Sequence, residues 1–179
     1  MRSIYCATLA VLFFTGTAHA FELTSTDVAD GATLKPDQVA NVFGCKGGNI
    51  SPALNWSNPP AGTKSFAVSL YDPDAPTGSG FWHWSAFDIP ATVTSLPSGA
   101  ASAGGTMPPG TIQSKADSGM VGYTGACPPP GPAHHYVFTI KALKVEKLGL
   151  DGSASGALIG FLTNANKLGE AKITAMYGQ

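Results

Sequence analysis

The sequence predicts a mainly β protein, an antiparallel β-sandwich with one or two peripheral helices. Three segments alternate apolar and polar residues with the period of two that half-buried strands require: residues 65–71, 82–89 and 136–143. Only one long stretch shows helical periodicity, and it lies late in the chain, over residues 154–168. We therefore expect strands to form the body of the protein and helices to lie on its periphery.

The remaining expected elements are shorter. Ser153 is a suitable N-cap for the late helix, whose apolar stripe is expected to face the core. The stripe consists of Leu158, Ile159, Leu162 and Ala165. Along the chain, the other elements are a strand at 21–24, a helical turn at 39–43, and strands at 54–57, 111–114 and 173–177.

The N-terminus has the pattern of a cleavable export signal. Arg2 precedes an apolar run over residues 7–14, and the segment ends in Ala18-His19-Ala20. A retained anchor is disfavoured, because a membrane-spanning helix needs about 20 apolar residues. We expect cleavage after Ala20, a periplasmic or secreted protein, and a single domain over residues 21–179.

The charge pattern excludes a nucleic-acid binder. Arg2 is the only arginine, so residues 21–179 carry nine lysines against eleven acids, a net charge of 9 − 11 = −2. Proteins that bind nucleic acids concentrate Lys and Arg to neutralise phosphates, and this chain has no basic run.

Two cysteines follow the export signal, Cys45 and Cys127. In an oxidising compartment such a pair indicates one disulfide, here closing a loop of 127 − 45 = 82 residues. The alternative is two unpaired buried thiols. A metal site is disfavoured, because the two cysteines lack the spacing of metal-ligand pairs.

The three histidines of residues 21–179 lie in two motifs that also hold the densest polar chemistry. The first motif is Asp-Pro-Asp-Ala-Pro at 72–76 followed by Phe-Trp-His-Trp at 81–84, and the second is the Pro-rich stretch 127–136. Asp72 ends one expected strand, His83 lies on the next, and His134 begins a later one. We expect all three segments to converge on one end of the sandwich.

These residues resemble the phosphatidylethanolamine-binding protein family, and specifically its bacterial Raf-kinase-inhibitor-like branch. The similarity runs over nearly the whole chain after the export signal. The matching stretches are 43–52, 62–68, 72–76, 82–83 and 131–136. The chain departs from the family at His135, where the family usually has Arg.

The resemblance implies a sandwich of the phosphatidylethanolamine-binding-protein type with a small anion pocket at one end. The ligand-binding residues it implies are Asp72, His83, His134 and Tyr136, with Asp74 and Trp82 close by. It implies no metal and no cofactor. The partners it implies are a small anion or phospholipid head group, a kinase or protease by analogy, and a second copy in a homodimer.

The same residues support anion binding on physical grounds. Imidazole is partly charged near neutral pH, so His83 and His134 can gain charge as an anion binds. Tyr136 adds a hydroxyl donor. Asp72 repels an anion unless it orients or charges a histidine, or is itself protonated beside a bound oxyanion. Without an arginine fork, phosphate should bind weakly.

Several alternatives stay open at this stage. Asp72 and Asp74 are also common turn residues, and His83 could be a core histidine. Trp82 and Trp84 should alternate away from His83 and serve packing, while His135 should face solvent, opposite His134.

Two other functional classes are compatible with these residues. A hydrolase could use Asp72 with His83 or His134 as an acid–base pair, but neither motif contains a serine or a free cysteine as nucleophile. The second class is a metal-binding protein, in which two histidines and a carboxylate would form a metal triad. We favour a non-enzymatic binding module.

Overall fold

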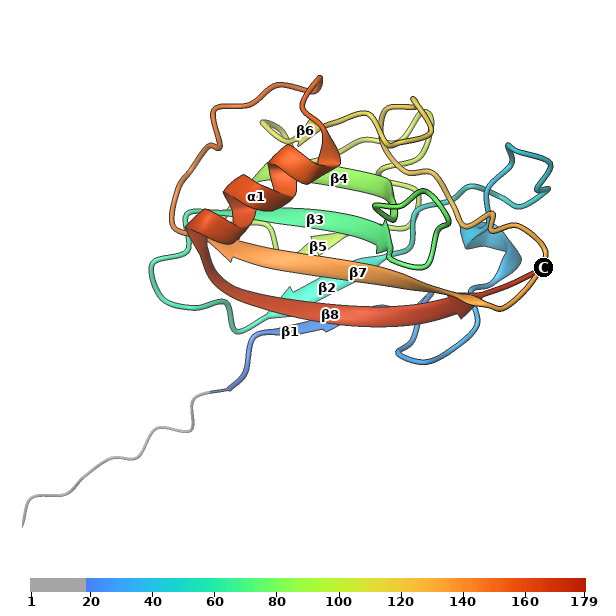
Figure 1. Cartoon of the computed structure of the whole chain (residues 1–179). Coiled ribbons are helices and arrows are strands. Elements are labelled where there is room, and N and C mark those ends of the chain that lie inside the picture. The colour runs from blue at the N-terminus through green and yellow to red at the C-terminus, as the bar shows by residue number, and fades with distance from the viewer. Residues whose placement is uncertain (1–18) are drawn as a thin grey trace, which may run out of the picture.

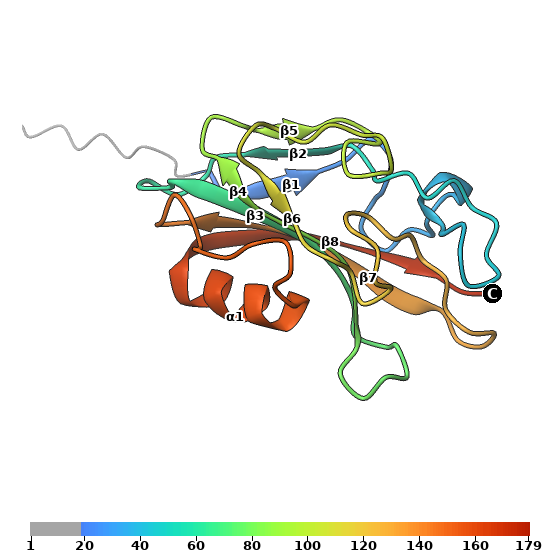
Figure 2. The same cartoon turned by 90° about the horizontal axis from the view of Figure 1, so that it is seen from above.

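The computed structural model describes residues 19–179, and the predicted β-sandwich is confirmed. Figure 2 shows three layers: a small sheet, a large sheet, and a single α-helix on the far face of the large sheet. All neighbouring strands are antiparallel. Most of the predicted export signal lies outside the described residues. Within 19–179, no helix has the length and apolarity needed to span a membrane.

The two sheets contain eight strands between them (Figure 1). The small sheet has the order β1 (Glu22–Thr24), β2 (Leu54–Ser57), β5 (Ser95–Leu96). The large sheet has the order β6 (Ile112–Gln113), β4 (Phe81–Pro90), β3 (Ser65–Asp72), β7 (His134–Leu143), β8 (Lys167–Tyr177). The helices are α1 (Gly156–Asn166) and the short 3-10 helix η1 (Pro36–Gln38).

The large sheet is buried on both faces where α1 covers it. Between the sheets, Trp56 packs edge-on against Phe66 with ring centroids 5.4 Å apart. On the opposite face, Ala67, Phe87 and Ile159 form a second, smaller apolar cluster beneath α1. The two layers of apolar packing hold β3, β4 and β7 in a fixed register, so their ends provide a rigid frame for side chains.

The predicted apolar stripe of the late helix is wrong. Ile159 is buried, but Leu158 is 43% exposed. The helix is rotated because Gly156 and Gly160 lie directly against the Trp82 ring, where a Cβ at Gly156 would approach ring carbons to 2.4 Å. Gly156 and Gly160 therefore face the sheet, and Leu158 faces outward.

The ends of this helix also differ from the prediction. Ser155, and not Ser153, caps it, with the Ser155 hydroxyl accepting a hydrogen bond from the Leu158 amide at 3.2 Å. The Ser153 hydroxyl instead donates to Asp151. The helix ends at Asn166 and passes directly into β8, which begins at Lys167 instead of residue 173.

The other differences concern short elements. The helical turn expected at 39–43 lies earlier, at η1, where Pro36 provides the first helical position. Val39 instead pairs with Ala126 in an isolated parallel bridge. The two-residue strand β5 was missed, because its length is too short to show a period.

Candidate functional site

The predicted site residues meet at a cavity of about 220 Å³ at the end of the sandwich where β3 ends and β7 begins. Asp72, His83, His134 and Tyr136 all line this cavity. They come from β3, β4 and β7, which are adjacent in the large sheet. Convergence therefore follows from the strand order.

Asp72 and His134 form a buried pair. The Asp72 Oδ2 lies 2.7 Å from the His134 Nδ1, and both residues are less than one-tenth exposed. The other carboxylate oxygen, Oδ1, accepts a hydrogen bond from the Asp74 amide at 2.8 Å. Because a carboxylate only accepts, Nδ1–H of His134 is the donor, which leaves Nε2 as its free nitrogen.

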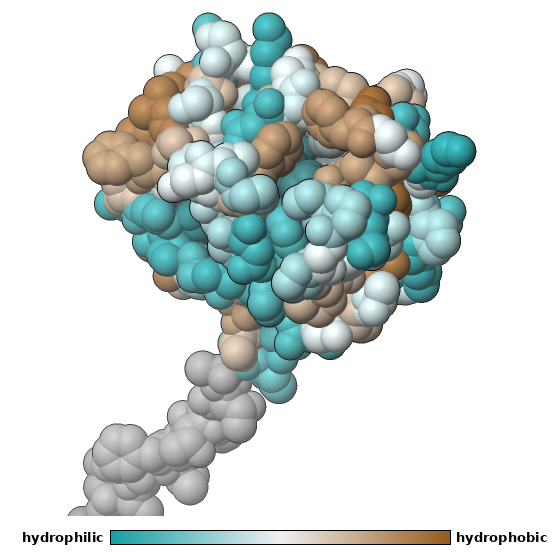
Figure 3. Space-filling model, turned by 45° about the vertical axis from the view of Figure 1, so that its right-hand side comes forward, coloured by the Kyte–Doolittle hydropathy of each residue, from teal (hydrophilic) through white to brown (hydrophobic). Residues whose placement is uncertain are grey.

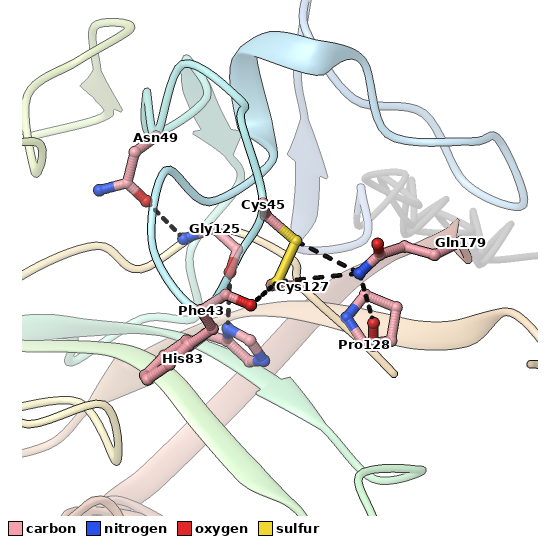
Figure 4. Close-up of a disulfide and its surroundings, with 8 residues drawn as sticks. All are labelled: Phe43, Cys45, Asn49, His83, Gly125, Cys127, Pro128 and Gln179. Carbon is pink, nitrogen blue, oxygen red and sulfur yellow. Dashed lines mark hydrogen bonds between the residues drawn. A yellow bond between two sulfur atoms is a disulfide. The ribbon is translucent and has the colours of Figure 1, made fainter. Parts of the chain in front are cut away.

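His83 is oriented in the same way by backbone carbonyls. Its Nδ1 lies 3.1 Å from both the Thr124 and the Gly125 carbonyl oxygens, so Nδ1–H donates and Nε2 is free. Figure 4 shows the contact with Gly125. Burial lowers the pKa of His83 below 6.5, although the two carbonyls and Asp72 oppose that shift. His83 is therefore neutral at pH 7.

A β-bulge places His83 in the cavity. In the β3–β4 register, Leu70 faces Trp84 and Tyr71 faces Trp82, so His83 is an extra residue on β4. The prediction that Trp84 alternates away from His83 is therefore wrong: Trp84 belongs to the core between the sheets. Trp82 faces the other side of the sheet, as expected.

Tyr136 supplies the one hydroxyl among the four residues. It is fully buried, its ring meets His83 edge-on at 5.3 Å, and its hydroxyl has no hydrogen-bond partner among residues 19–179. Burial, and then the charge of Asp72, raises the pKa of Tyr136, so the hydroxyl stays protonated. An unpaired buried hydroxyl costs about 1–3 kcal/mol, which an acceptor in the cavity would recover.

The cavity wall is otherwise mainly apolar and contains no lysine or arginine. Figure 3 brings this end of the molecule forward and shows apolar side chains, in brown, in patches among polar ones. Sequence reasoning missed this wall, because nothing in the spacing of an isolated Phe or Pro marks it as a cavity residue. The missed apolar residues are Phe43, Ala75, Pro76, Phe81, Pro128 and Pro129.

Two of the six predicted ligand residues, Asp74 and Trp82, do not line the cavity. The Asp74 carboxylate accepts hydrogen bonds from the backbone amide and the Nδ1 of His135, each at 2.7 Å, on the exposed side of the motif. These two bonds, the backbone one foremost, lower the pKa of Asp74. Trp82 lies under α1. His135 is exposed, as predicted.

The predicted disulfide between Cys45 and Cys127 is confirmed, with Cα atoms 5.9 Å apart. Cys127 lines the cavity, and the bond joins the segment carrying Phe43 to the Pro-rich segment after Cys127 (Figure 4). The Gln179 side chain donates to the Pro128 carbonyl at 2.6 Å beside it. The disulfide therefore fixes two sides of the cavity rim to each other.

The same segments are also joined by hydrogen bonds. Asn49 accepts from the Gly125 amide through Oδ1 at 2.8 Å and donates to the Tyr123 carbonyl through Nδ2 at 3.3 Å. The Gly125 carbonyl is one of the two carbonyls that orient the His83 ring. Asn49 thus supports the orientation of His83 from outside the cavity.

The described residues offer no metal-ligand set. Among residues 19–179, no three His, Cys, Asp or Glu side chains lie close enough together to hold a metal ion. Asp72 and His134 are hydrogen-bonded to each other, and His83 Nδ1 is bound to carbonyls. The arrangement therefore holds two imidazoles with free Nε2 atoms above a carboxylate.

A comparison with known protein families decides the relationship. The family model described as "Phosphatidylethanolamine-binding protein" matches residues 24–178. The chain belongs to the phosphatidylethanolamine-binding protein family. The resemblance inferred from the motifs is thereby confirmed.

Within this family, the chain is similar to two Escherichia coli proteins. It is 51% identical to the UPF0098 protein YbcL over 180 residues, covering 99% of this chain and 98% of YbcL. It is 49% identical to the UPF0098 protein YbhB over 156 residues, covering 87% of this chain and 99% of YbhB. The crystal structure of YbcL, described as a member of the mammalian PEBP family, matches with a TM-score of 0.87 at 52% identity, covering 90% of this chain and 99% of that one. None of these names states an enzymatic activity.

Proposed function

We propose that this protein is a non-enzymatic, exported binding protein whose cavity takes a small oxyanion such as phosphate or a phosphorylated head group. The observation that carries the proposal is the convergence of three potential donors, Tyr136 Oη and the Nε2 atoms of His83 and His134, on one cavity. The N-terminal signal pattern and the disulfide support export.

Binding in this cavity is coupled to proton uptake. With both histidines neutral, the cavity holds the single negative charge of Asp72 and repels an anion. Protonation of His83 and His134 converts both free Nε2 atoms into donors and makes the local charge positive. Burial lowers the pKa of His83 in the free protein, and a bound anion opposes that shift. Affinity for an oxyanion therefore increases as the pH falls through the range in which His83 protonates.

The apolar wall favours a phosphorylated group that carries an organic substituent. Phe43 is 68% exposed, and it stands with Pro128 and Pro129 among the residues that line the cavity. A free phosphate would leave these surfaces in water, whereas the carbon chain of a head group would cover them. We expect phosphorylethanolamine or a short-chain phospholipid to bind more tightly than phosphate.

Replacing Tyr136 with Phe tests the proposal. Loss of one hydrogen bond to the anion should weaken sulfate binding by about tenfold at pH 6, measured by calorimetry. Stability should hold or increase, because the hydroxyl that the variant removes is buried without a partner. The matched control is Tyr71→Phe, whose hydroxyl bonds the Ser79 carbonyl outside the cavity. Equal affinity in Tyr136→Phe and the original protein would contradict the proposed donor.

A hydrolase is the second candidate, and the Asp72–His134 pair favours it. A carboxylate that orients a buried histidine through Nδ1 leaves Nε2 free to act as a base on water. The two threonines that line the cavity do not supply a nucleophile, because Thr77 donates to the Gly80 carbonyl and Thr124 bonds Ser118. Turnover of p-nitrophenyl phosphate or acetate that disappears in His134→Asn would replace the binding proposal with this one.

A protein partner and a homodimer are proposed by family analogy alone. Relatives in other organisms inhibit kinases or proteases, and fold-level analogy does not transfer that role. Inhibition assays against kinases and proteases test for a protein partner. Light scattering of the purified protein tests for a homodimer.

A further inference from the structure

A second hollow lies on the outer face of the large sheet, beside α1. Its volume is about 490 Å³, and it shares no lining residue with the cavity described above. Figure 1 views this face: α1 crosses one end of the strands, and much of β7 and β8 beyond it is uncovered. The floor consists of outward-facing side chains of β3, β4, β7 and β8. We call this hollow the outer groove.

The outer groove is positively charged on a protein that is negative as a whole. Lys141, Lys167 and Lys172 line it together with a single acid, Glu170. The local balance is 3 − 1 = +2, whereas residues 19–179 carry nine lysines and eleven acids. Glu170 is already paired, with Lys167 at 2.8 Å and Lys172 at 3.2 Å. An approaching anion therefore meets an excess of positive charge.

Lys141 makes no salt bridge in this groove, although Glu170 lies opposite it across β7 and β8 and attracts its charge. Its ammonium donates to the Asn164 Oδ1 at 2.7 Å and the Thr163 Oγ1 at 3.2 Å, and no carboxylate of residues 19–179 lies within 4.0 Å. The side chain is partly buried. Burying a cation is costly, and the neutral oxygens, with a Glu170 that also pairs Lys167 and Lys172, compensate for only part of that cost. An anionic ligand would add to that compensation.

The uncharged side chains of the groove match a sugar ring. Tyr71 and Trp82 form a tilted aromatic pair with centroids 4.6 Å apart, and both stay partly exposed although α1 packs on the Trp82 ring. Ser69 and Thr139, which face each other across β3 and β7, offer hydroxyls on the same floor. Aromatic rings pack against the apolar C–H face of a sugar, while hydroxyls and amides pair with its hydroxyl groups.

We propose that the outer groove binds an anionic saccharide, a short chain of sugar rings bearing carboxylates. An acidic peptide fits less well, because strand addition along residues 174–176 of the β8 edge is blocked. The backbone of residues 31–34 already bonds that edge, with Gly31 donating to the Thr174 carbonyl and Leu34 to the Met176 carbonyl. A peptide at that part of the edge would therefore bind without the backbone hydrogen bonds that usually give it affinity.

The test is NMR titration of the purified protein with an oligogalacturonate, against a neutral glucose oligomer of the same length. The oligogalacturonate should shift the Trp82 indole and the Thr139 and Lys141 amides, and the double variant Lys141→Gln/Lys172→Gln should weaken binding at least tenfold. The control Lys144→Gln/Lys147→Gln removes the same charge from two exposed lysines outside the groove and should bind like the original.

Four results would overturn the proposal: no binding, shifts elsewhere, equal binding of the neutral oligomer, or equal loss of affinity in the control variant. Oligoglutamate that binds as tightly as the oligogalacturonate would also overturn it, in favour of a peptide site. The lysine variants must keep the melting temperature of the original, and Lys172→Gln alone provides a milder test, because Lys172 is exposed. His134→Asn should leave saccharide binding intact, so failure here and failure of the anion cavity are distinguishable.

Discussion

His134→Asn is expected to weaken oxyanion binding by about 10- to 100-fold while the protein stays folded. The Asn amide can replace Nδ1–H as the donor to Asp72, but it has no counterpart to Nε2. The variant therefore removes the proposed ligand atom and retains a partner for the buried carboxylate. Calorimetry with sulfate at pH 6 measures the loss, and a thermal melt checks the fold.

His134→Ala should behave differently from His134→Asn in stability. Alanine leaves Asp72 with the Asp74 amide as its one remaining hydrogen-bond donor, and an undersatisfied buried carboxylate costs about 1–3 kcal/mol or more. The matched control is His135→Ala, since His135 is exposed and points away from the cavity. Full affinity in His134→Asn, or an equal loss in His135→Ala, would contradict the role given to Nε2 of His134.

Removal of the disulfide is expected to lower the free energy of unfolding by about 4–5 kcal/mol. The reason is that the bond closes a loop of 82 residues and so restricts the unfolded chain. Urea denaturation of oxidised and reduced protein measures the change. The double variant Cys45→Ala/Cys127→Ala should match the reduced protein, and added dithiothreitol should not change it further.

Loss of the disulfide should also weaken anion binding, while the strands of the sandwich stay folded. Cys127 lines the cavity, and both cysteines lie outside the strands. The hydrogen bonds of Asn49 continue to join the two segments and to orient His83. Equal midpoints of unfolding for oxidised and reduced protein would contradict the stabilising role of the bond.

The long strands could be predicted because they depend on local patterns, and the four cavity residues were implied by the family resemblance. Alternation identified β3, β4 and β7, and once these strands are adjacent, Asp72 and His134 must lie near each other. The disulfide followed from having two cysteines in a chain expected to be exported.

Other features depend on tertiary contacts that no local pattern contains. Gly156 and Gly160 read as poor helix residues, yet their close contact with Trp82 sets the rotation of α1 and leaves Leu158 exposed. The bulge that directs His83 into the cavity depends on pairing with β3, and alternation alone placed Trp84 on the wrong face. The outer groove was missed because Lys141 and Lys172 come from different strands, separated in sequence by α1.

The measurement that tests the central claim most directly is NMR of the histidine rings, recorded from pH 5 to 8 with and without sulfate. Sulfate does not titrate in this range, so any proton taken up binds to the protein. We expect sulfate at pH 7 to move the His83 and His134 rings together and saturably toward their protonated positions, while His135 stays unchanged. If sulfate leaves both rings unchanged across the whole pH range, the cavity is not an anion site and the proposed function is wrong.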